Sequence, residues 1–130
     1  MICVIVLNWN GASDTIACLA SLQNLVSPSY PFSILVCDNG STDDSISAIE
    51  AYINTAKKTN IALLRSETNL GFAGGMNLGI RQALADPQTE YIWLLNNDTV
   101  VDSGALRALV EKMNSSPDVG MCGSTLLYLD

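Results

Sequence analysis

The sequence has no histidine and few basic residues. Its 130 residues include 6 Lys and Arg against 13 Asp and Glu, a formal net charge of −7. The absence of histidine excludes Ser-His-Asp and Cys-His triads, imidazole bases and the common zinc ligand sets. Without a basic run, nothing neutralises a phosphate backbone, so we expect no nucleic-acid partner. Any acid–base or metal chemistry must come from carboxylates.

Long hydrophobic runs and paired cysteine motifs are also missing. The apolar N-terminal run ends at Asn8 and lacks a basic segment, so it is too short for a signal-peptide core or a membrane span. No cysteines stand at C-x-x-C spacing, and most lie in apolar runs. They are Cys3, Cys18, Cys37 and Cys122. We therefore expect buried, reduced thiols in a cytoplasmic protein.

Short apolar runs alternate with amphipathic stretches along the chain. The composition, 48% hydrophobic and 15% charged, suits one compact core, and we place one domain over residues 1–130. The apolar runs predict strands at 2–7, 33–37, 61–64, 91–95 and 119–122. The stretches between them predict helices, opened by Ser13, by Ser41 or Thr42, and by Asp102. This alternation is typical of an α/β fold, a mostly parallel sheet with helices on both faces.

Two further features of the pattern bear on this domain. The third predicted helix has an apolar stripe at helical spacing, made of Phe72, Met76, Ile80, Ala83 and Leu84. Residues 124–130 begin another apolar segment and then stop, with no helix or tail after them. We therefore expect the chain to be a truncated domain.

Polar residues gather where the predicted strands end. In an open parallel sheet, ligands bind beyond the carboxyl ends of the strands, because helix N-termini and loop amides converge there. The polar clusters at these positions are 8–11, 38–43, 69–71 and 96–98. We expect all four to lie on one edge of the sheet.

The cluster Asn96-Asn97-Asp98 follows the continuous apolar run 91–95. A carboxylate there can bind Mg²⁺ or Mn²⁺, which take oxygen ligands and accept several of them from water and substrate phosphates. A single Asp98 is therefore sufficient when a diphosphate is bound. The alternative is that Asp98 and Thr99 only begin a turn.

Asp38 ends the second predicted strand. Its carboxylate can accept the N–H of a nucleobase or a ribose hydroxyl, and the following Gly40 allows a tight turn. We interpret Asp38 as a ligand contact. The neighbouring Asn39, Ser41 and Asp43 fit an Asx turn followed by a helix cap.

The two tryptophans receive different interpretations. Trp9 follows the first predicted strand and can form one wall of a base pocket, whereas Trp93 lies within a strand and belongs to the core.

Glycines cluster at the start of the third predicted helix. Because glycine is disfavoured inside helices, Gly74, Gly75 and Gly79 indicate close approach of the backbone to a phosphate or to a neighbouring strand. Gly74 and Gly79 have Walker spacing, but Ile80-Arg81 replaces the Lys-Ser/Thr pair. Nothing like G-x-G-x-x-G follows the first strand. These departures argue against P-loop and dinucleotide-dehydrogenase functions.

Together these motifs resemble the nucleotide-binding half of a family 2 glycosyltransferase with the GT-A fold, in wording closest to the rhamnosyltransferase-like branch. The segments that carry the resemblance are 6–10, 36–43, 69–80 and 94–98. The resemblance implies an inverting, metal-assisted transfer of a hexosyl or deoxyhexosyl unit from a nucleoside diphosphate sugar. The acceptor would be a hydroxyl of a glycan or a lipid-linked molecule, in polysaccharide or cell wall biosynthesis.

The resemblance also implies roles for individual residues. Leu7 and Trp9 would border the base, Asp38 would bind the base or ribose, Gly74, Gly75 and Asn77 would line the donor pocket, and Asn96, Asn97 and Asp98 would occupy the D-x-D motif. Within that motif Asp98 would hold Mg²⁺ or Mn²⁺ and so stabilise charge on the leaving group.

The sequence departs from the family pattern at three places. Asn96 replaces the earlier acidic residue of the D-x-D motif, and Met76 stands where relatives often have an arginine. The catalytic base of the family lies in the later half, and no residue up to Asp130 fits that role. We therefore expect this segment alone to be catalytically silent. The full protein is expected in the cytoplasm, with peripheral association at the inner face of the membrane as an alternative.

Two other classes share part of this pattern. A receiver-like signalling domain would require an acidic pair after the first strand and a lysine after the fifth, and neither is present. A non-catalytic nucleotide-binding or nucleotidyltransferase-like module would require a basic, glycine-rich loop after the first strand, which is also missing.

Overall fold

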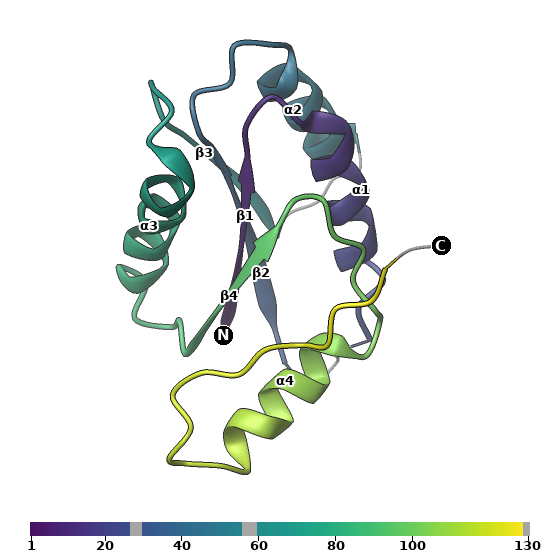
Figure 1. The fold of residues 1–130 in the computed structure, drawn as a ribbon, viewed down its shortest axis with the longest axis vertical. Coiled ribbons are helices and arrows are strands. Elements are labelled where there is room, and N and C mark those ends of the chain that lie inside the picture. Colours follow the sequence, from purple (N-terminus) through teal and green to yellow (C-terminus); the bar gives the residue numbers. More distant parts are fainter. Residues whose placement is uncertain (27–29, 56–59, 129–130) are drawn as a thin grey trace.

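The computed structural model describes residues 1–26, 30–55 and 60–128. Strands and helices alternate along the chain (Figure 1). Their bounds are β1 (Ile2–Asn8), α1 (Ala12–Leu22), β2 (Phe32–Asp38), α2 (Ser45–Thr55), β3 (Ile61–Arg65), α3 (Gly71–Leu84), β4 (Tyr91–Asn96) and α4 (Ala105–Asn114). Four predicted strands form within one residue of their expected ends.

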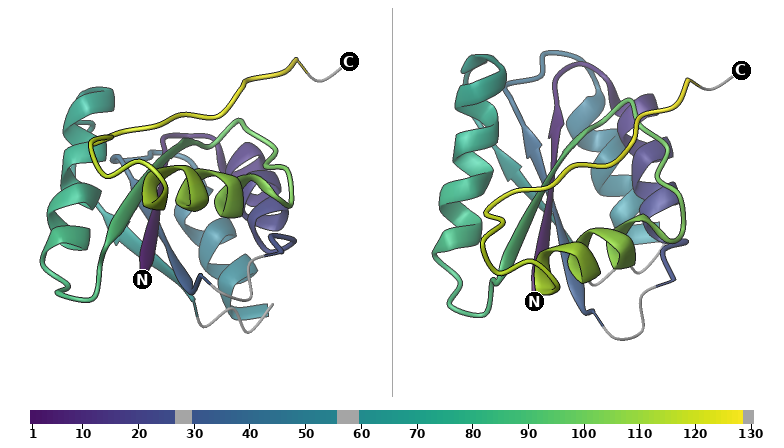
Figure 2. Two further views of the ribbon diagram at one scale, coloured as in Figure 1. Left: turned by 90° about the horizontal axis from the view of Figure 1, so that it is seen from below. Right: turned by 60° about the horizontal axis from the view of Figure 1, so that its bottom comes forward.

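The four strands form one parallel sheet in the order β3-β2-β1-β4. Helix α3 covers one face, and α1 and α2 cover the other, with α4 beside the amino ends of the strands (Figures 1 and 2). This arrangement confirms the predicted α/β fold with helices on both faces.

The centre of the core is β1, which lies between β2 and β4. Val4 and Val6 are completely buried against α1 and α2, and Ile5 is buried on the opposite face, towards α3. A strand covered on both faces needs apolar side chains at every position, which explains its continuous apolar run. Helix α3 does not fully cover its face of the sheet at β4, where Leu94 is 48% exposed.

The fifth predicted strand, Val119–Cys122, does not form. This part of the chain is irregular, and Met121 is 87% exposed. The segment after α4 continues along the outside of the molecule (Figure 2), where Leu126 and Tyr128 are also exposed. Apolar character alone cannot make a strand, because a strand needs a neighbour to satisfy its backbone hydrogen bonds. Residues 129 and 130 of the predicted C-terminal segment lie outside the described residues.

The predicted helix starts are displaced. Helix α1 begins after Gly11 rather than at Ser13. Helix α2 begins at Ser45, because the Asp43 carboxylate accepts the Ser45 backbone N–H at 3.0 Å. Asp102 accepts the N–H of Gly104 at 2.8 Å and so precedes α4 by one turn.

The apolar stripe of α3 forms in part. Met76, Ile80 and Ala83 pack towards the sheet together with Gly75 and Gly79, whereas the predicted end members Phe72 and Leu84 are exposed. Among the described helices, none is both long and apolar enough to cross a membrane.

Candidate functional site

The carboxyl ends of the four strands lie on one edge of the sheet, at the top of Figure 1. The register places Asn8 beside Asp38 and Leu7 beside Asn96, so the loops after β1, β2 and β4 are neighbours. We call this edge the rim and define it as residues 8–11, 38–43, 66–71 and 96–99. The four polar clusters predicted from the sequence therefore do meet on one edge.

Asp38 lies beneath the surface of the rim. Its side chain is 0% exposed. The Asn8 amide donates to Asp38 Oδ1 at 2.8 Å, the Ser41 hydroxyl donates to the same oxygen at 2.6 Å, and the Ser41 backbone N–H donates to Oδ2 at 3.0 Å. The predicted direct contact between Asp38 and a base or ribose is therefore not supported. The carboxyl group instead holds the ends of β1 and β2 together.

Asn39 joins β2 to the start of α3. Its side-chain amide donates to Asn69 Oδ1 at 3.0 Å and to the Gly71 carbonyl at 3.1 Å, and its Oδ1 accepts the Leu70 N–H at 3.0 Å. The sequence indicated a local turn here, but the partners lie about 30 residues further along the chain. Gly40 follows with φ +74°, where a side chain would collide with the backbone of Thr68.

The glycines of α3 pack against strands. A β-carbon on Gly75 would lie 2.5 Å from Leu7 Cδ1, and one on Gly79 would lie 2.7 Å from Cys37 Sγ and from Ile5 Cγ2. Of the two partners considered for these glycines, the neighbouring strand is correct at both positions. Leu7 packs in this same contact and so belongs to the core beneath the rim.

Gly74 and Asn77, the two other residues predicted to line the donor pocket on this segment, also lie in α3. Gly74 faces its own helix start, since a β-carbon there would lie 2.7 Å from Leu70 Cβ. Asn77 is exposed, two positions from the sheet-facing Gly75, and helical residues so spaced point in different directions. Neither residue is brought together with Asp38 or Asp98 by any described contact.

The loop after β4 places its three polar residues differently. Asn97 is partly buried, and its side-chain amide donates to Thr15 Oγ1 at 3.1 Å and to the Gly11 carbonyl at 3.4 Å. Asn96 is exposed, and its backbone carbonyl accepts the Thr99 hydroxyl at 2.7 Å. Asp98 is exposed, and no hydrogen bond or ion pair within the described residues engages its carboxylate. Asp98 is therefore the acidic group at this end of β4 that is open to a cation.

Trp9 is the aromatic side chain of the rim. It is 56% exposed, directly after β1. The next residue, Asn10, has φ +50°, and its Oδ1 accepts the Thr42 N–H at 2.8 Å. The Asn10 N–H in turn donates to Ser41 Oγ at 2.9 Å. These bonds fix the loop that carries Trp9 against the loop after β2.

The sequence reasoning missed Thr15, and it placed Asn8 in the polar cluster 8–11 without a role of its own. Asn8 and Thr15 are both 0% exposed, and the Thr15 hydroxyl donates to Asn8 Oδ1 at 2.7 Å. The available signal was a polar residue on the buried stripe of α1, since Thr15 precedes Cys18, Leu19 and Leu22 at helical spacing.

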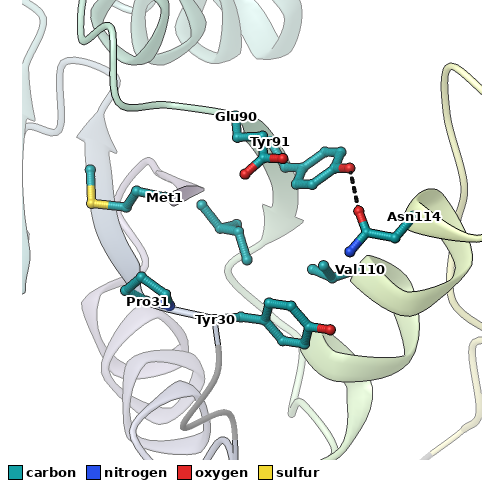
Figure 3. A pocket seen from close by; sticks show the side chains of 8 residues that line it. Met1, Tyr30, Pro31, Glu90, Tyr91, Val110 and Asn114 are labelled. Atoms are coloured by element: carbon teal, nitrogen blue, oxygen red, sulfur yellow. Dashed lines mark hydrogen bonds between the residues drawn. The ribbon is translucent and has the colours of Figure 1, made fainter.

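Two pockets lie away from the rim. One of about 250 Å³ lies at the amino ends of β1 and β4, where Tyr91 donates a 2.8 Å hydrogen bond to Asn114 (Figure 3). Another, of about 380 Å³, lies between α4 and residues 122–125. Neither is lined by a residue predicted to bind the donor.

Within the described residues, no three Cys, Asp or Glu side chains lie together as a metal site. A divalent cation at Asp98 would therefore take most of its ligands from water and from a bound molecule, as Mg²⁺ does at phosphate sites.

The parallel sheet with helices on both faces and polar residues along its carboxyl edge matches the GT-A fold of solved glycosyltransferases. The family model described as "Glycosyl transferase family 2" matches residues 3–130. The chain belongs to this family. Membership of this family decides against the receiver-like and nucleotidyltransferase-like alternatives.

Known proteins similar to this chain include a poly-beta-1,6-N-acetyl-D-glucosamine synthase of Staphylococcus epidermidis, 30% identical over 101 residues that cover 77% of this chain and 23% of the relative. The structure of S. aureus TarS 1–349 superposes with a TM-score of 0.72 at 25% identity, covering 89% of this chain and 33% of that one. TarS has also been solved with UDP and with UDP-GlcNAc.

A mannosyltransferase of Pyrobaculum calidifontis, solved with GDP-Man and Mn²⁺, has a TM-score of 0.76 at 21% identity, over 86% of this chain and 32% of that one. This likeness concerns the fold. The chain thus spans 23% to 33% of the length of these proteins.

Proposed function

We propose that the chain is the donor-binding part of an inverting glycosyltransferase. It would bind a nucleoside diphosphate sugar for transfer of a hexosyl or deoxyhexosyl unit to a hydroxyl of a glycan or lipid-linked acceptor. Membership of the family supports the class of reaction. The similarity to a polysaccharide synthase and to TarS, which binds UDP and UDP-GlcNAc, supports a nucleotide sugar as the donor and polysaccharide biosynthesis as the setting.

The observation that carries the proposal is the position of Asp98. It is exposed and free of protein partners among the described residues, on the same rim as the exposed Trp9. A free carboxylate and a flat aromatic surface on one edge of the sheet suit a ligand with a charged diphosphate at one end and a base at the other.

Asp98 fits a Mg²⁺ or Mn²⁺ ion, because these ions accept one carboxylate together with water and phosphate oxygens. When bound, the ion would neutralise charge on the leaving diphosphate. Asn96, two residues earlier, offers an exposed neutral amide in place of a second carboxylate. We infer that the metal binds weakly until the nucleotide supplies its phosphate oxygens.

The remaining assignments follow from the rim. Trp9 would stack on the base, while Asp38, Asn97, Leu7 and Gly75 would shape the site from beneath. The catalytic base and the acceptor site would be supplied by other parts of the full protein, so residues 1–130 alone would transfer no sugar. We propose a cytoplasmic location, at the inner face of the membrane when the acceptor is lipid-linked.

Calorimetric titration tests this proposal. The chain should bind one of UDP, TDP or GDP more tightly with Mn²⁺ than without it. Asp98→Ala should abolish the Mn²⁺-dependent part and leave thermal unfolding unchanged. Asp118→Ala, another exposed carboxylate, is the matched control and should behave as the native chain. Unchanged metal dependence in Asp98→Ala would remove Asp98 from this role, and binding of no nucleoside diphosphate would contradict the donor site itself.

A further inference from the structure

Four side chains form a continuous line of hydrogen bonds beneath the rim. Asn97 Nδ2 donates to Thr15 Oγ1 at 3.1 Å, Thr15 Oγ1 donates to Asn8 Oδ1 at 2.7 Å, and Asn8 Nδ2 donates to Asp38 Oδ1 at 2.8 Å. Every bond points the same way and the line ends on a carboxyl group, so each bond polarises the next. We call these four residues the buried relay.

The relay connects the metal side of the rim to the base side. It begins in the loop after β4, passes through α1 and the end of β1, and ends at β2. Asp38, Asn8 and Thr15 are each 0% exposed, so a ligand on the rim cannot touch them. Gly11 leaves room for the Asn97 side chain to reach Thr15, since a β-carbon on Gly11 would lie 3.1 Å from Asn97 Nδ2.

Thr15 is the central member of the buried relay because its hydroxyl both donates and accepts a hydrogen bond. It donates to Asn8 and accepts from Asn97 through a single oxygen atom, which an amide side chain cannot do because its donor and acceptor are different atoms. Valine has the same shape without either capacity, and serine keeps both. The geometry therefore offers an isosteric test and a conservative rescue at one position.

We propose that Thr15 and Asn8 are positioning residues that fix the loop carrying Asp98 relative to the loops that carry Trp9 and Ser41. The role at the metal rests on the proposed function. Asp98 itself has no protein partner among the described residues, so its direction depends on the backbone of its loop. Asn97, the residue immediately before it, is held by the relay. Loss of the Thr15 hydroxyl would remove the shorter of the two hydrogen bonds that hold the Asn97 amide, and so weaken binding of a metal ion that no mutated atom contacts.

The test compares Thr15→Val, Thr15→Ser and Ile34→Val. Ile34 is a buried residue near the amino end of β2, and its substitution controls for a general loss of stability. Hydrogen exchange is first measured over residues 96–101 without ligand. We expect faster exchange in Thr15→Val, and exchange as in the native chain for Thr15→Ser and Ile34→Val. Equal exchange in Thr15→Val and Ile34→Val would overturn the proposal.

The second readout is the affinity for UDP, or for GDP if that is the nucleotide bound, with and without Mn²⁺. Thr15→Val should weaken Mn²⁺-dependent binding by about fivefold or more, the effect of one lost buried hydrogen bond, with Thr15→Ser restoring it. If the native chain binds nucleotide and Thr15→Val binds it equally well, the positioning role fails while the proposed function stands. If the native chain binds none, the proposed function fails, and hydrogen exchange alone decides whether Thr15 fixes the loop.

Discussion

Gly79 of α3 lies so close to Ile5 of β1 that a β-carbon on the glycine would be 2.7 Å from Ile5 Cγ2. Together with Gly75, one helical turn earlier, it lets α3 lie directly on the sheet. This close packing also positions the start of α3 relative to the sheet, where the Asn39 side chain donates to the Gly71 carbonyl at 3.1 Å. Gly75 and Gly79, which the sequence linked to a phosphate or to a neighbouring strand, therefore act on the rim by letting α3 pack close to the sheet.

Gly79→Ala should destabilise the chain. The added methyl group would collide with Ile5 and Cys37, both buried, so we expect a net loss of about 1–3 kcal/mol even though alanine favours helices. Urea unfolding measures the change. Gln82→Ala, exposed on the same helix, should stay within about 0.5 kcal/mol of the native chain. If Gly79→Ala proves as stable as the native chain, α3 can move away from the sheet.

Asp38→Ala should unfold more easily by about 3 kcal/mol, because it leaves the Asn8 amide and two Ser41 donors without their acceptor. Chemical denaturation gives the value, with the exposed Asp44→Ala as the control of equal charge change. A variant of native stability that no longer binds nucleotide would contradict the structural role and restore Asp38 as a ligand contact.

Trp9 should report nucleotide binding. Because it is exposed at the rim while Trp93 packs in the core, a bound base should quench the fluorescence of Trp9. We expect quenching by the bound nucleoside diphosphate in Trp93→Phe and none in Trp9→Leu. Loss of stacking should cost Trp9→Leu about 1–3 kcal/mol of binding free energy. Undiminished affinity in Trp9→Leu would place the base elsewhere.

Alkaline pH should destabilise the chain partly through Cys37. Burial, with a contribution from Cys3, raises the pKa of the Cys37 thiol from 9.0 to about 12. The folded state therefore holds this proton more tightly than the unfolded state, and the stabilisation present below pH 9 is lost as the pH rises towards 12.

The free energy of unfolding in urea, measured from about pH 8 to about pH 11, tests this dependence across the range that the cysteine pKa defines. Cys37→Ala should show a shallower decline above pH 9. Val36→Ala, the buried neighbour on β2, should lose stability equally at every pH and keep the native slope. Parallel slopes for Cys37→Ala and the native chain would contradict the assignment.

Much of the fold could be predicted because its signals are local. The apolar runs of β1 and β2 had no alternative to a buried strand, and four ends of parallel strands necessarily share one edge. Residues 119–122 carried the same local signal and failed, because no described strand lies beside them to complete their hydrogen bonds. The start of α2 was misplaced for a different reason, since the Asp43 carboxylate accepts the Ser45 N–H and the helix begins only at Ser45, after Ser41 and Thr42.

The sequence by itself determined the class of fold, the order of its elements and the edge on which polar residues gather. Only the tertiary structure decided that Asp98 is exposed while Asp38 is buried at the ends of β1 and β2, and that Gly75 and Gly79 contact strands. The reason is that burial depends on neighbours remote in the chain. Asn8 meets Asp38 across 30 residues and Asn97 meets Thr15 across 82, distances over which no local pattern carries information.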